Sequence, residues 1–210
     1  MKKFISIILS LCICLLLSNK IYASSSDNDF YSFFKNALTH DSFYALDNQG
    51  ADITSFILEL YNSKGEAAVY SYFLNHSGAV GFEEKTVSSS ARSLEEAVTL
   101  NNYQYYTANG TYYGAKSWKT LLCGTYYYNT KTGLITRAPS PNLYLVEANF
   151  GTNFSPYLYP GNINSSISNQ SSVTFFASYT MYTDYKDEYS SGLGSLKISY
   201  GSHVHRFTAS

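Results

Sequence analysis

The chain has 210 residues, with 14 Lys or Arg against 15 Asp or Glu, so its formal net charge is −1. Charged residues make up 14% of the chain, well below the ~25% of an average soluble domain, and 22 tyrosines take part of their place. This balance leaves no basic footprint for nucleic acid, so we expect no DNA or RNA partner. The length favours a single domain with a substantial core.

Residues 1–23 predict a cleavable secretory signal peptide. Lys2 and Lys3 form a positive n-region, and residues 4–17 form an apolar run that is too short to span a bilayer comfortably. The small residue Ala23 marks the expected cleavage point, with an uncleaved N-terminal anchor as the alternative. We therefore expect a secreted, extracellular protein that has no stable membrane insertion once the signal is removed.

Cysteine use favours a bacterial origin. Two of the three cysteines lie in the predicted signal, so Cys123 is left alone and the mature chain has no intramolecular disulfide. Secreted eukaryotic domains of this size usually carry a disulfide framework. Together with the short Lys-Lys signal, this pattern favours a Gram-positive bacterium as the source.

Residues 24–77 show helical spacing of their apolar side chains. The first predicted helix carries five apolar residues at i, i+3, i+4, i+7 and i+8, namely Phe30, Phe33, Phe34, Ala37 and Leu38. A second helix is expected after Asp52, whose carboxylate can accept from the free amides at its start. Residues 66–75 fit either a helix or a strand, and we favour the helix.

Residues 78–210 predict strands, because runs rich in Ser, Thr, Tyr and Val alternate with Gly, Asn and Pro. The expected strands cover residues 86–93, 97–107, 115–129, 134–138, 142–149, 173–183 and 195–208. A five-residue loop, 129–133, indicates one hairpin, and a second is expected to join the last two strands. Residues 151–170, which contain two prolines, are expected to be irregular. The predicted fold is α+β, a short helical segment followed by a mainly antiparallel β-sandwich.

The candidate catalytic and metal-binding residues are few. His203 and His205 are two residues apart on a predicted strand, so both could reach one ion, but we expect them on the exposed face of that strand. Cys123 lies in a predicted core strand and is expected to be a buried, inert thiol. The paired carboxylates are adjacent in sequence and point to opposite faces, which does not suit a glycosidase. We expect no metal, no cofactor and no catalytic residue.

Aromatic clusters are the most distinctive feature of the sequence. Consecutive tyrosines on a strand face opposite ways, so some rings must lie outside the core. Such rings either complete a core that is poor in Leu, which we favour, or form a binding face for sugars or proteins. If they form a binding face, Tyr112, Tyr113 and Trp118 are the expected contact residues.

These observations favour a secreted, non-enzymatic protein that binds a cell-surface, envelope or extracellular partner, either a glycan or a protein. A secreted antimicrobial (bacteriocin-like) or toxin-like protein is the alternative. A hydrolase of cell-wall or glycan substrates comes third, because none of the common catalytic motifs is present.

Overall fold

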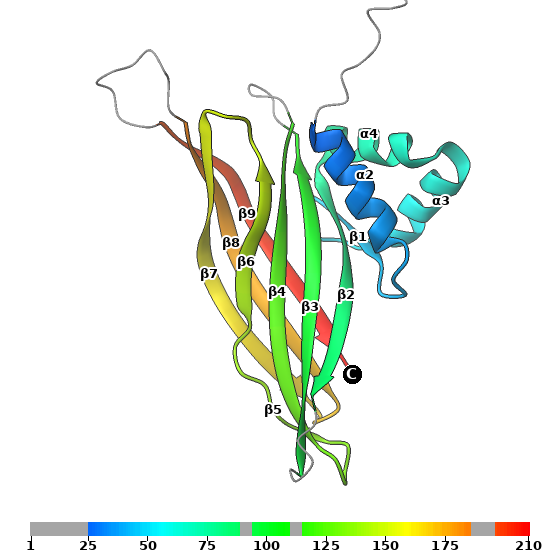
Figure 1. Ribbon diagram of the computed structural model, residues 1–210, viewed down its shortest axis with the longest axis vertical. Coiled ribbons are helices and arrows are strands. Elements are labelled where there is room, and N and C mark those ends of the chain that lie inside the picture. The colour runs from blue at the N-terminus through cyan, green and yellow to red at the C-terminus, as the bar shows by residue number, and fades with distance from the viewer. Residues whose placement is uncertain (1–24, 89–93, 110–114, 186–195) are drawn as a thin grey trace, which may run out of the picture.

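The computed structural model describes residues 25–88, 94–109, 115–185 and 196–210. Within these residues the chain is mostly antiparallel β-structure in two sheets, with three short helices (Figure 1). The mostly antiparallel part of the prediction is therefore confirmed. The helices are α2 (Ser25–Ala37), α3 (Thr54–Lys64) and α4 (Glu66–His76). No helix among these residues is long and apolar enough to cross a membrane.

The first sheet contains, in the described residues, six strands in the order β1-β2-β3-β4-β5, with β6 also paired to β4. Its strands are β1 (Tyr44–Asp47), β2 (Gly78–Ser88), β3 (Glu95–Ala108), β4 (Lys116–Asn129), β5 (Ile135–Arg137) and β6 (Asn142–Asn149). The second sheet has the order β7-β8-β9 and is formed by β7 (Phe154–Ser168), β8 (Ser172–Tyr185) and β9 (Leu196–Ala209).

The helices lie together against one end of the first sheet, beside β1 and β2 (Figure 1). They bury the aromatic face of α2, together with Ile57 of α3 and Phe73 of α4, against Val80 and Phe82 of β2. The start of α3 agrees with the sequence, because Asp52 Oδ1 accepts a hydrogen bond from Thr54 N at 2.8 Å. Residues 66–75 are helical, as we favoured, because α4 must present one apolar side to this core.

The two sheets pack against each other through the other face of the first sheet. Every second residue of β8 is at most 2% exposed, and these residues are Val173, Phe175, Ala177, Tyr179, Met181 and Thr183. They meet Leu100 and Leu122 in one cluster and Trp118 in another. The predicted hairpin is also present: Asn129 N donates to Leu134 O at 2.9 Å, and Gly133 adopts a φ of 70°.

The prediction that residues 151–170 are irregular is wrong. Phe154–Ser168 forms β7, which pairs with β8 along its length. Two features allow prolines here. β7 is an edge strand, so one of its sides has no strand partner in the sheet. On that side a proline, which lacks the N–H, removes no hydrogen bond between strands. A register shift between Pro160 and Ile163 absorbs the remaining mismatch, and there Asn162 N donates to Ser178 Oγ at 2.8 Å.

The first strand of the β part begins at Gly78, eight residues before the predicted start, and a short strand, β1, pairs with it. The missed segment, Gly-Ala-Val-Gly-Phe, is buried on both faces. Val80 and Phe82 face the helices, whereas Ala79 faces the second sheet. Gly81 leaves room for the ring of Tyr44, with which a Cβ would collide. The small residues of this segment are therefore needed for packing.

Candidate binding surface

Trp118 is not exposed, so its prediction as a contact residue is corrected. Its side chain is 1% exposed, because Trp118 lies on the face of β4 that packs against the second sheet. Its Nε1 donates to Tyr179 Oη at 3.1 Å, and its ring stacks on Tyr106 with centroids 4.7 Å apart. The other two predicted contact residues, Tyr112 and Tyr113, lie outside the described residues.

The two histidines also face inward rather than outward. A register shift in the β8–β9 pairing, at Gly201 with its φ of 91°, changes which residues of β9 face the first sheet. His205 is 0% exposed and His203 is partly buried among the rings of Tyr106, Trp118 and Tyr179. The alternation of apolar and polar residues along β9 does not reveal where its inward-facing positions shift by one residue.

His205 belongs to a hydrogen-bonded network between the sheets. Its Nε2 donates to Asn102 Oδ1 at 2.7 Å, and Tyr44 Oη donates to the same oxygen at 2.7 Å. Its Nδ1 accepts from Thr120 Oγ1 at 3.0 Å. Burial lowers the pKa of His205 from 6.5 to about 3, so the ring is neutral at physiological pH. Both nitrogens are occupied, which gives this histidine a structural role.

Neither a metal centre nor a Cys-His pair forms in the described part of the chain. No group of three His, Cys, Asp or Glu side chains there could hold an ion. Cys123 is partly buried on the outer face of β4, opposite to the face that meets His205, and burial raises the pKa of its thiol. A raised pKa makes the reactive thiolate rarer.

An exposed aromatic cluster lies instead on the outer face of the second sheet. It consists of Tyr157 and Tyr159 on β7, Tyr182 on β8 and Lys197 on β9, and we call it the tyrosine platform. Tyr157 lies directly opposite Tyr182 in the strand register, and their rings stack with centroids 5.8 Å apart. Tyr159 meets Tyr182 edge to face at 6.4 Å and is 63% exposed.

Lys197 brings a cation to the tyrosine platform, and Asp184 of β8 lies directly opposite it in the strand register. Its Nζ lies 4.0 Å from the centroid of the Tyr182 ring and 5.6 Å from that of Tyr157. A hydrogen bond to Tyr157 raises the pKa of Lys197, so the ammonium stays protonated. Hydroxyl groups continue along the same face, where Thr180 Oγ1 and Ser202 Oγ are 3.2 Å apart. The platform thus combines an open ring face, a cation and hydrogen-bonding groups.

The sequence contained a signal for this platform. Tyr157 and Tyr159 are two residues apart, which is the spacing of side chains on one strand face. The signal was missed because the two prolines favoured an irregular segment. Tyr182 and Lys197 join the cluster only through strand pairing, which spacing along the chain does not reveal.

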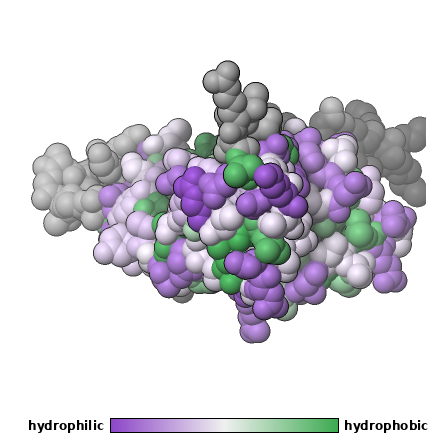
Figure 2. All heavy atoms as spheres, turned by 90° about the horizontal axis from the view of Figure 1, so that it is seen from below, coloured by the Kyte–Doolittle hydropathy of each residue, from purple (hydrophilic) through white to green (hydrophobic). Residues whose placement is uncertain are grey.

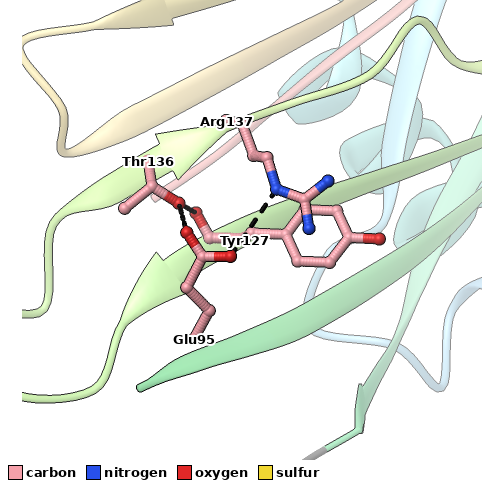
Figure 3. A network of polar contacts seen from close by, with 4 residues as sticks. All are labelled: Glu95, Tyr127, Thr136 and Arg137. Atoms are coloured by element: carbon pink, nitrogen blue, oxygen red, sulfur yellow. Dashed lines mark hydrogen bonds and ion pairs between the residues drawn. The ribbon is translucent and has the colours of Figure 1, made fainter. Parts of the chain in front are cut away.

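A second polar group is structural. Arg137 Nε lies 3.6 Å from Glu95 Oε2, and its guanidinium covers the Tyr127 ring at 3.5 Å (Figure 3). Thr136 Oγ1 contacts Glu95 Oε1 at 2.9 Å and the carbonyl oxygen of Tyr127 at 3.1 Å. These contacts hold the short strand β5 to β3 and β4. Because these four residues already contact one another, we infer that they stabilise the fold and do not bind a ligand.

The end of the molecule away from the helices carries apolar side chains. Figure 2 shows hydrophobic residues in the middle of this end, with hydrophilic residues around them. Val87, Leu94, Leu134 and Ile167, which are between 38% and 57% exposed, lie at strand ends here. Residues 89–93 join Ser88 to Leu94 and lie outside the described residues.

Comparison with protein-family models, curated proteins and solved structures finds no match to this chain.

Proposed function

We propose that this is a secreted, non-enzymatic binding protein whose tyrosine platform contacts a glycan of a cell surface or envelope. The observation that carries the proposal is the exposed ring of Tyr159 beside the Tyr157–Tyr182 stack and the ammonium of Lys197. The scaffold is a β-sandwich, whose second sheet presents the platform outward.

A glycan fits the chemistry of this surface. The C–H face of a sugar ring is apolar and packs on an aromatic face, while its hydroxyls need hydrogen-bond partners. Tyr159 provides an exposed ring, and the side chains of Thr180 and Ser202 provide hydroxyls on the same sheet face. Positions on paired strands are rigid, so few contacts must be ordered when the ligand binds.

The test is a pull-down of mature protein, residues 24–210, with insoluble cell walls and with envelope polysaccharide. We expect Tyr159→Ala to reduce the bound fraction about tenfold, because loss of one well-packed aromatic contact costs on the order of 1.4 kcal/mol. The matched control is Tyr144→Ala on β6, a tyrosine that is 50% exposed on the first sheet. The proposal is wrong if Tyr159→Ala binds as well as the control.

A growth-inhibition spot test separates this proposal from the antimicrobial alternative. A binding protein retains wall binding without inhibiting neighbouring strains. If the Tyr159→Ala variant still inhibits growth, the antimicrobial function is favoured and must depend on another surface.

A further inference from the structure

A groove lies on the opposite side of the molecule from the tyrosine platform, between α2 and the first sheet. One side of α2 lines it. The α2 residues concerned follow the spacing i, i+3, i+4 and i+7, which places them on one helix face. Its lining residues are Asp29, Ser32, Phe33, Asn36, Tyr105, Lys119 and Glu147. We call it the α2 groove. Its volume of about 390 Å³ lies within the ~300–1,000 Å³ range of small-ligand sites.

Lys119 is held over aromatic rings in this groove. Its Nζ lies 5.1 Å from the centroid of Phe33 and 5.2 Å from that of Tyr103. Phe33 is fixed in the helix core, and Tyr103 packs against the same core. The ammonium is therefore positioned by two anchored rings, which limits the entropy that it loses when an anion binds.

The charged side chains of the groove form no ion pair with one another within the described residues. Lys119 and Glu147 lie directly opposite on β4 and β6, the arrangement in which opposite charges usually pair. In the described part of the chain, however, the ion pairs within 4.0 Å are Lys35–Glu66 and Arg137–Glu95, and none includes Lys119, Glu147 or Asp29. Lys119 turns to the rings and leaves the carboxylate of Glu147 available.

We propose that the α2 groove binds a short zwitterionic peptide, one that carries both a free ammonium and a free carboxylate. The ligand carboxylate contacts Lys119, and its ammonium contacts the carboxylates of Asp29 and Glu147. The small exposed edges of Phe33 and Tyr105, which are 7% and 4% exposed, form the apolar part of the groove floor. Two acidic groups and one basic group match this ligand, whereas a purely anionic ligand would be repelled by the two carboxylates.

The test is calorimetric titration of mature protein with three probes: alanyl-alanine, its N-acetyl derivative without the ammonium, and its C-terminal amide without the carboxylate. We expect saturable binding of the dipeptide with a dissociation constant of roughly 0.1–1 mM, and at least about tenfold weaker binding of both derivatives. Equal binding of the three probes, or no saturation by the dipeptide below about 10 mM, would overturn the proposal.

Two variants locate the binding. Lys119→Met retains the aliphatic stem on Phe33 and removes the charge, and Glu147→Gln keeps the shape of its side chain. Each is expected to weaken dipeptide binding about tenfold, whereas Lys131→Met, in the exposed loop after β4, leaves it unchanged. Unaltered binding by Lys119→Met, with a melting temperature like that of the unmodified protein, would refute the assignment. Tyr159→Ala leaves dipeptide binding intact, so failure of the glycan proposal is distinguishable.

Discussion

At the residue scale, the interior between the sheets depends on a neutral histidine. His205 donates to Asn102 and accepts from Thr120, so an uncharged ring satisfies both partners. A protonated ring would have to donate through both nitrogens and would place a positive charge in a fully buried site. The lowered pKa of His205 reflects the free-energy cost of burying a protonated ring.

The consequence is a pH dependence of the free energy of unfolding. The pKa of His205 is about 3 in the folded chain against 6.5 ordinarily, so between these values the unfolded chain binds one more proton. The contribution of His205 is complete above pH 6.5 and falls by roughly 1.4 kcal/mol per pH unit towards pH 3. Urea unfolding at pH 7.0, 6.0 and 5.0 measures it.

The control for this prediction is His205→Gln, which retains hydrogen-bonding groups without a titrating ring. This variant should be less stable at pH 7 but should lose less stability than the unmodified protein between pH 7 and pH 5. Identical pH slopes for the two proteins would show that other groups cause the acid sensitivity.

At the element scale, contact between the sheets relies on one position without a side chain. Gly124 of β4 faces Phe175 of β8, and a Cβ at this position would lie 2.6 Å from the Phe175 ring. The ring is fully buried and packs against Phe207 with centroids 5.1 Å apart, so it has little room to move. Close approach of β4 and β8 therefore requires glycine here.

Gly124→Ala should consequently destabilise the protein by about 1–3 kcal/mol through overpacking. The matched control is Cys123→Ala at the neighbouring position, whose side chain lies on the outer face of β4 and is only partly buried. This control should change the free energy of unfolding by less than about 1 kcal/mol. Chemical denaturation of both variants is the measurement, and equal destabilisation would contradict the role assigned to Gly124.

At the scale of the whole molecule, the two proposed binding surfaces lie on opposite outer faces. The α2 groove belongs to the first sheet and its helices, and the tyrosine platform belongs to the second sheet. The two packed sheets separate them, so neither surface shares a residue with the other. Such an arrangement allows one molecule to hold a glycan and a peptide simultaneously.

Independent surfaces predict additive effects. The double variant Tyr159→Ala/Lys119→Met should lose wall binding as the first single variant does and dipeptide binding as the second does, within about 0.5 kcal/mol. Parallel pull-downs and titrations measure this. A saturating dipeptide concentration that changes wall binding would instead reveal coupling between the faces.

Local sequence was sufficient for strand β8, whose apolar and polar residues alternate, and for the hairpin loop 129–133, whose last residue is the glycine that the turn needs. It could not show what covers each side. Trp118 and His205 are buried because they lie on the facing sides of the two packed sheets, and β7 tolerates its prolines because it is an edge strand. The tyrosine platform and the α2 groove likewise join residues from separate elements. Side-chain pattern is a property of the chain, whereas burial and proximity arise only when its elements pack.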